Sequence, residues 1–196
     1  MLLVEMQLQL KKMKGNKRIF MENLEEKLKV LYSEEELQKR ISEIANVIDN
    51  DYKDCKELIV ICVLKGAAFF TVDLVKKMKT PIVFEVMQVS SYSGTETTGA
   101  ITVKKDLDCK IEGKDVLIVE DIIDTGYTLR ALRQDLLARN PNSLKIAVLL
   151  DKKERRKVEV PVDYVGYEIP NKFVVGYGFD VDEHGRNIPY IGYIEE

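Results

Sequence analysis

Apolar positions along the chain follow two alternating patterns, short unbroken runs and longer stretches in which apolar residues recur every three or four positions. The unbroken runs are rich in β-branched residues and too short for core helices, which is typical of strands covered on both faces. The periodic stretches predict amphipathic helices. Strands are predicted at residues 58–64, 82–89, 116–119, 146–150, 164–169 and 173–177. Helices are predicted from about 33 to 48, 67 to 74 and 126 to 139.

Local signals mark some of these boundaries. Ser33 and Glu36 have the spacing of a capping box, and Asn140-Pro141 stops the last helix. Apolar strands that alternate with amphipathic helices predict an α/β fold, in which helices flank a parallel core sheet. Ligands of such sheets bind at the carboxyl ends of the strands. We therefore expect functional residues at 65, at 120–128 and from 151 onward.

The first 20 residues differ in composition from the rest of the chain. They hold five basic side chains and one acidic side chain, with little apolar pattern. We expect residues 1–20 to be an appended, weakly ordered segment and residues 21–196 to form one domain. Because the whole chain has a net charge of −3, the domain is more acidic than that total. A bound anion must therefore be held by local groups rather than by the overall field.

Composition and run length exclude several functional classes. The longest apolar run, 58–64, is far shorter than the ~20 residues of a membrane-spanning helix. The three cysteines lack CxxC spacing, and two lie in or beside apolar runs, which favours free thiols and a cytoplasmic location. The net charge gives no general reason to expect a nucleic-acid partner. Small molecules and protein partners remain.

One segment carries most of the candidate chemistry. Glu120 and Asp121 directly follow a predicted strand. Asp124 comes three residues later, and Thr125-Gly126-Tyr127-Thr128 then opens a helix. Free N–H groups at a helix start, with two hydroxyls and a glycine, form a cradle for a phosphate. Because paired carboxylates just before it can bind sugar hydroxyls or Mg²⁺, the segment predicts a ribose 5-phosphate site.

A simpler interpretation applies to a shorter part of this segment. In an isolated Asp-Thr-Gly, Asp124 or Thr125 would only cap the helix, and Glu120 and Asp121 would be solvated turn residues. The complete run, including the apolar strand before it, favours the phosphate site.

The run from Val119 to Leu129 closely resembles the phosphoribosyl pyrophosphate (PRPP) binding motif of type I phosphoribosyltransferases. Other segments resemble the hypoxanthine-guanine branch of that family. Its pyrophosphate loop, closing loop and purine-side segment correspond to Leu64-Lys65-Gly66-Ala67, Ser91-Tyr92, and Phe173 to Asp180 with Arg186. The resemblance covers about residues 33–196 and implies the type I fold, with a small hood formed by the N- and C-terminal segments.

The resemblance implies a reaction as well as a fold. The 5-phosphoribosyl group of PRPP passes to N9 of hypoxanthine or guanine, giving IMP or GMP, with Mg²⁺ as cofactor and pyrophosphate as leaving group. The transition state of such a transfer resembles an oxocarbenium ion. The protein must therefore position two substrates, neutralise pyrophosphate and move one proton.

The same resemblance gives roles to the residues of the PRPP motif. Asp124 is implied as the general acid/base near N7 of the purine. The backbone and hydroxyls of residues 125–128 are implied to hold the 5-phosphate. Glu120 and Asp121 are implied to bind the ribose hydroxyls or the metal.

Roles at the pyrophosphate follow in the same way. Lys65 and Gly66 are implied to contact it through their backbone, with a non-proline cis bond at Leu64–Lys65. Arg186 offers a planar guanidinium to the pyrophosphate oxygens. Asp180, in the purine-side segment, is implied to hold a second Mg²⁺.

For the base, Lys152 matches the family lysine that donates to the purine 6-oxo group. Such a donor rejects adenine, whose 6-amino group would also donate. Lys153 takes this role if the register is shifted by one residue. Phe173 is implied to stack on the purine, and Val174 to contact its edge through the backbone.

The polar stretch 90–99, with its charged continuation to Lys105, is implied to close over the site and exclude water. Its glycines and hydroxyl side chains are typical of a mobile loop. Ser91 and Tyr92 are its expected contact residues.

Two other functions use the same fold. A phosphoribosyltransferase for adenine or xanthine would differ in base recognition, and Lys152 with residues 173–180 argues against adenine. An RNA-binding regulator would need a basic face, but the basic clusters after residue 20 are short. We therefore expect small-molecule substrates, with no nucleic acid and no membrane as partner. Homodimer and homotetramer both stay open, as does the preference among hypoxanthine, guanine and xanthine.

Overall fold

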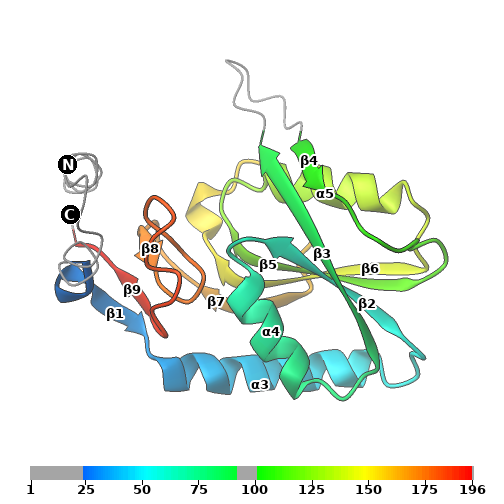
Figure 1. Ribbon diagram of the computed structural model, residues 1–196, viewed down its shortest axis with the longest axis horizontal. Coiled ribbons are helices and arrows are strands. Elements are labelled where there is room, and N and C mark those ends of the chain that lie inside the picture. Colours follow the sequence, from blue (N-terminus) through cyan, green and yellow to red (C-terminus); the bar gives the residue numbers. More distant parts are fainter. Residues whose placement is uncertain (1–23, 92–100, 196) are drawn as a thin grey trace. The chain divides into compact units, whose positions relative to one another are not determined.

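The computed structural model describes residues 24–91 and 101–195 (Figure 1). The chain divides into two compact units. The first, which we call the sheet unit, comprises Lys39–Asn171. The second, the terminal unit, comprises the N-terminal part up to Gln38 together with Lys172–Glu196. The predicted appended segment, residues 1–20, lies outside the described residues.

The sheet unit is built on six strands in the order β4-β3-β2-β5-β6-β7. Only β4, among these strands, is antiparallel to its neighbour. The strands are β2 (Leu58–Leu64), β3 (Ile82–Ser91), β4 (Ile101–Lys105), β5 (Asp115–Ile123), β6 (Ser143–Asp151) and β7 (Tyr164–Glu168). The helices are α3 (Glu34–Asp51), which begins in the terminal unit, α4 (Ala68–Lys77), α5 (Tyr127–Leu137) and the short 3-10 helix η1 (Lys153–Arg155). The predicted α/β fold with a largely parallel sheet is confirmed.

Burial explains why β2 is an unbroken apolar run. The strand lies between β3 and β5, and all its residues except the last are buried. Its alternate residues Ile59, Ile61 and Val63 belong to one core cluster with the apolar face of α5, which contributes Leu129 and Leu132. The other face of the strand is covered as well, as a helix-flanked parallel sheet requires.

The structure corrects the prediction for residues 101–105. They form strand β4, which pairs antiparallel with β3, whereas the sequence placed them in a loop. The pattern was weak because β4 is an edge strand whose three central residues are exposed. Ser91 is the last residue of β3 and pairs with Ile101, while Tyr92 lies outside the described residues.

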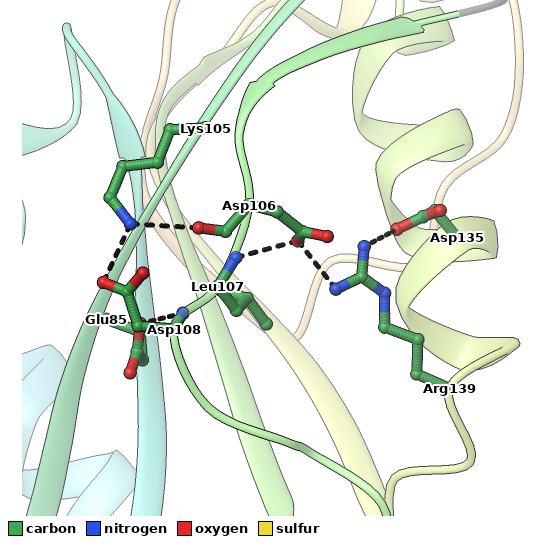
Figure 2. Close-up of polar contacts among 7 residues, drawn as sticks. All are labelled: Glu85, Lys105, Asp106, Leu107, Asp108, Asp135 and Arg139. Atoms are coloured by element: carbon green, nitrogen blue, oxygen red, sulfur yellow. Dashed lines mark hydrogen bonds and ion pairs between the residues drawn. The ribbon is translucent and has the colours of Figure 1, made fainter.

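Polar contacts tie the chain that follows β4 to the end of α5 (Figure 2). The guanidinium of Arg139 pairs with Asp106 and with Asp135, each over 2.7 Å. Glu85, buried in β3, accepts a hydrogen bond from the backbone N–H of Asp108 over 3.1 Å. The hydrogen bond from Arg139, with a smaller contribution from its charge, lowers the pKa of Asp106. The chain leaving the β3–β4 hairpin is therefore fixed to both β3 and the segment after α5.

The terminal unit holds a three-stranded antiparallel sheet in the order β1-β9-β8. Its strands are β1 (Lys29–Tyr32), β8 (Val174–Val175) and β9 (Ile191–Tyr193). The strand predicted at 173–177 is thus shorter than expected, because Gly176 and Tyr177 have φ angles of 98° and 50° and turn the chain. Across the described residues of both units, none of the helices is long and apolar enough to span a bilayer.

Candidate active site

A cavity of about 190 Å³ lies at the carboxyl end of β5. Its lining comes from the part of the chain that runs from the end of β5 into the first turn of α5, namely residues 120–126, 128 and 129. All residues predicted for ribose 5-phosphate binding except Tyr127 line it. The cavity therefore lies where ligands of parallel sheets bind.

Glu120 and Asp121 lie within the last part of β5, not after its end as the sequence predicted. The strand continues because β6 runs beside it, pairing Glu120 with Val148 and Ile123 with Asp151. Burial raises the pKa of Glu120 well above its ordinary value, and repulsion from the Asp121 carboxylate adds to this shift. The cavity wall thus holds a carboxylate pair that a bound cation would stabilise.

Gly66 packs directly against Asp121. A Cβ atom on Gly66 would lie 1.6 Å from Asp121 Oδ2 and 2.6 Å from its Cγ, so no larger residue fits while Asp121 keeps its position. The preceding Leu64–Lys65 peptide bond is cis, as the family resemblance implied. The side chain of Lys65 is exposed. The predicted pyrophosphate loop and a predicted ribose carboxylate are therefore in contact.

Gly126 leads into α5 in the left-handed region, with a φ of 88°. A Cβ atom here would lie 2.9 Å from the Val158 carbonyl oxygen and 3.0 Å from Arg156 Cδ. Glycine is thus required both by the backbone conformation and by the close approach of the 156–158 segment. Since the first N–H groups of a helix have no carbonyl partner within it, the start of α5 offers donors to an anion.

Two cationic side chains act on Asp124. Arg155 Nε donates to Asp124 Oδ1 over 2.7 Å. Lys152 is only 8% exposed, and burial lowers its pKa while the charge of Asp124 opposes that shift. Lys153, in contrast, is exposed and pairs with Glu168. The charge of Asp124 therefore acts on the buried Lys152, whereas Lys153 pairs with Glu168 at the surface.

The remaining predicted residues lie in the terminal unit. Phe173 is exposed, whereas Val174 is buried in β8. Arg186 pairs with Asp180 Oδ1 over 2.7 Å and donates to the Gly178 carbonyl oxygen over 2.7 Å. Arg186, predicted to bind pyrophosphate, and Asp180, predicted to hold the second metal, thus form an ion pair with each other.

Comparison with known proteins decides the family. The phosphoribosyl transferase domain matches residues 28–182 of this chain. The chain belongs to the phosphoribosyltransferase family. It is therefore a transferase enzyme.

Individual phosphoribosyltransferases are similar to this chain over most of their length. Hypoxanthine-guanine phosphoribosyltransferase of Aquifex aeolicus is 47% identical over 171 residues, covering 87% of this chain and 96% of the relative. A crystal structure of a hypoxanthine phosphoribosyltransferase from Staphylococcus aureus has a TM-score of 0.84 and 45% identity, covering 88% of this chain and 94% of that one. A structure of hypoxanthine phosphoribosyl transferase from Trypanosoma cruzi has a TM-score of 0.82 and 42% identity. The match covers 85% of this chain and 91% of that one, and the structure concerns the role of that protein's C-terminal region in its oligomeric state and enzymatic activity.

The phosphoribosyltransferase family implies Mg²⁺, and the donors of the cavity fit this ion. Mg²⁺ prefers oxygen ligands, keeps several waters and commonly uses one or two carboxylates together with substrate phosphates. In residues 24–91 and 101–195, no three His, Cys, Asp or Glu side chains are grouped to hold a metal by themselves. Glu120 and Asp121 therefore fit a Mg²⁺ that binds together with an anionic substrate.

Glu120→Gln is expected to stabilise the ligand-free phosphoribosyltransferase at neutral pH. The pKa of Glu120 is raised by folding, so the folded protein binds more protons than the unfolded chain between the ordinary and the raised value, and stability falls as pH rises through that window. Glutamine has no proton to lose. Thermal unfolding without Mg²⁺ should give the variant the higher Tm at neutral pH, with the difference vanishing near pH 4. An unchanged or lower Tm at neutral pH would contradict the raised pKa.

Two residues near the phosphoribosyltransferase cavity, Arg155 and Arg156, were not predicted. Arg156 pairs with the buried Asp151, and its side chain lies against Gly126. Both arginines belong to the basic run 152–157, which the sequence presented only as a short charged cluster. Their position directly after a strand end, where ligands of parallel sheets bind, was the signal that could have identified them.

Proposed function

We propose that this protein transfers the 5-phosphoribosyl group of PRPP to N9 of hypoxanthine or guanine in a Mg²⁺-dependent reaction, giving IMP or GMP and pyrophosphate. The observation that carries the proposal is the cavity at the end of β5, where a carboxylate pair and the start of α5 line one small space. The names of the similar proteins from Aquifex aeolicus and Staphylococcus aureus support the choice of base.

In this proposal, residues 125–128 hold the 5-phosphate of PRPP. The N–H groups at the start of α5 and the hydroxyls of Thr125 and Thr128 supply donors, and the left-handed turn at Gly126 lets the backbone approach closely. Glu120 and Asp121 bind the ribose hydroxyls or Mg²⁺. Bound Mg²⁺ would supply positive charge to the leaving pyrophosphate.

Asp124 is the proposed general acid/base. Its carboxylate lines the same cavity as the phosphate donors. As N9 of the purine bonds to C1′ and the bond from C1′ to pyrophosphate breaks, the purine must lose a proton. Asp124 takes or shares that proton at N7, which prevents charge from building up on the base.

Lys152 is proposed to donate to the 6-oxo group of the purine. The burial of Lys152, opposed in its effect on the pKa by the charge of Asp124, supports this role, because a buried ammonium group needs a strong acceptor. The pairing of Lys153 with Glu168 on the surface supports Lys152 over its neighbour.

Lys152→Ala is expected to raise KM for hypoxanthine and guanine by about 10- to 100-fold, because a donor to the base is lost. KM for PRPP should change by less than about threefold, since the phosphate donors are untouched. Steady-state kinetics with each substrate varied in turn measure both values. Lys153→Ala is the matched control. If Lys153→Ala gave the purine effect and Lys152→Ala did not, the 6-oxo assignment would move to Lys153.

The remaining substrate contacts are proposed for residues outside the β5–α5 stretch. Phe173, which is exposed, stacks on the purine, and Val174 contacts its edge through the backbone. Lys65 and Gly66 bind pyrophosphate by their backbone, together with Arg186, and Asp180 binds a second Mg²⁺. Ser91 and Tyr92 belong to the segment proposed to exclude water.

The proposal extends to the setting of the enzyme. All three cysteines of the chain are free, which supports a reducing compartment, and we place the protein in the cytoplasm. We propose a homodimer or homotetramer as the working form, which sedimentation of the purified chain distinguishes from a monomer.

The experiment that tests the proposed base is a panel of four purines. Purified protein, PRPP and Mg²⁺ are incubated in parallel with hypoxanthine, guanine, xanthine or adenine, and nucleotide formation is followed by chromatography. We expect IMP and GMP as the main products. AMP as the dominant product would overturn the proposed base specificity while leaving the phosphoribosyl transfer intact.

A further inference from the structure

The pair between Arg155 and Asp124 has no role in the reaction described so far. We propose that Arg155 is a positioning residue for the general acid/base: its guanidinium fixes Asp124 Oδ1, so that Oδ2 is held toward N7 of the purine. This inference rests on the proposed function, because it assigns Arg155 a task only if Asp124 moves the purine proton. The contact itself is Nε to Oδ1 at 2.7 Å.

The backbone holds the two partners at a fixed separation. The N–H of Lys152 donates to the Ile123 carbonyl oxygen over 3.0 Å, and the N–H of Lys157 donates to the Thr125 carbonyl oxygen over 3.0 Å. The two acceptors are the residues on either side of Asp124. The two donors enclose η1, which carries Arg155 at its end. Backbone hydrogen bonds therefore join the segment 152–157 to the residues on both sides of Asp124.

The neighbouring arginine fixes the direction of this segment. Arg156 pairs with Asp151, which is buried, and its Cδ atom would lie 3.0 Å from a Cβ on Gly126. Arg156 is thus held against Gly126 at the start of α5. Arg155, the residue before it, pairs with Asp124. The guanidinium of Arg155 also donates to Asn171 Oδ1 over 3.5 Å, which is a long contact.

The exposure of the Arg155 and Asp124 side chains argues against a purely structural role for their ion pair. The side chains of Arg155 and Asp124 are 46% and 38% exposed. Ion pairs this accessible contribute little to folding stability. Removing Arg155 should therefore leave the fold and the Tm nearly unchanged, so that a kinetic effect reports on the site.

The chemistry needs one carboxylate oxygen and not both. When N9 bonds to C1′, the proton leaves N7 for Oδ2 of Asp124, and the electron pair of the broken C1′–O bond leaves with pyrophosphate. Arg155 keeps its own protons, because the guanidinium does not deprotonate in proteins. It contributes by restricting rotation of the Asp124 carboxylate, so that Oδ2 is oriented before the purine arrives.

The test compares Arg155→Gln, Arg155→Lys and a control, Lys157→Gln. Lys157 carries the same charge, is exposed and lies two residues away in the same segment. We expect Arg155→Gln to lower kcat about tenfold with KM for PRPP within about twofold of wild type, since only the orientation of the acid/base changes. Arg155→Lys should restore at least half of the lost rate constant, and Lys157→Gln should match the wild type.

A double-mutant cycle shows whether Arg155 acts through Asp124. In the Asp124→Asn background, Arg155→Gln should change kcat by less than about twofold, because the group it orients is gone. An equal tenfold loss in that background would overturn the inference in favour of a general structural role. A lower KM for the purine with an unchanged or higher kcat in Arg155→Gln would also overturn it, because the pair would then obstruct the base. A wild-type protein inactive with all four purines would overturn the proposed function itself.

Discussion

Replacing Asp124 with Asn should lower kcat for hypoxanthine and guanine by about 10²- to 10⁴-fold, the usual contribution of a general acid/base. The asparagine has nearly the same shape but cannot take a proton. Asp124 lines the cavity, but the 5-phosphate is proposed to be held by residues 125–128, so PRPP should still bind. Steady-state kcat and a calorimetric titration with PRPP and Mg²⁺ measure the two quantities separately.

The matched control for this substitution is Glu154→Gln. Glu154 is an exposed carboxylate in η1, the same short helix that carries Arg155. It should retain wild-type kinetics, because removing an exposed charge near the site changes little. Near-wild-type turnover of Asp124→Asn would show that another group moves the proton, and the assigned role would be wrong.

Gly66→Ala should lower kcat/KM for PRPP by about 100-fold, the scale of loss expected when a binding group is displaced by an ångström or more. The added Cβ would lie 1.6 Å from Asp121 Oδ2, so the carboxylate has to rotate out of its position. This single methyl group therefore acts on both the proposed pyrophosphate loop and the proposed ribose and metal ligand. The measurement is initial velocity against PRPP concentration at saturating Mg²⁺ and base.

A second variant shows whether that effect passes through Asp121. In an Asp121→Ala background the carboxylate is absent, and the Cβ of residue 66 meets no carboxylate oxygen. The additional effect of Gly66→Ala should then shrink to about threefold or less, since the two changes share one contact. Equal losses in both backgrounds would mean that the backbone of the loop, not the carboxylate, is what the methyl group disturbs.

The sequence predicted those helices and strands whose apolar pattern lies entirely within their own segment of the chain. The run 58–64 is strand β2 to the residue, because a strand buried on both faces reads as continuous β-branched residues. Three short strands were missed: the edge strand β4 exposes its centre, and β1 and β9 comprise only 4 and 3 residues. Their pairing depends on partners far away in the chain, which local periodicity does not contain.

The same distinction applies to the site. The stretch from Glu120 to Thr128 was predicted because its residues are contiguous in the sequence, and all of them except Tyr127 line one cavity. The contact of Gly66 with Asp121 was not, because it depends on β2 and β5 lying side by side. The pair of Asp124 with Arg155 spans 31 residues and depends in the same way on β5 and β6. Contacts created by strand order are therefore what the structure adds.

Product stoichiometry with the purified full chain tests whether the protein carries out the proposed Mg²⁺-dependent transfer. Protein is incubated with PRPP, hypoxanthine and Mg²⁺, and IMP and pyrophosphate are quantified over time, with a parallel arm in which EDTA removes the metal. We expect equimolar IMP and pyrophosphate with Mg²⁺, and almost none of either with EDTA. Absence of IMP in the presence of Mg²⁺, or formation of IMP at the same rate after the metal is removed, would contradict it.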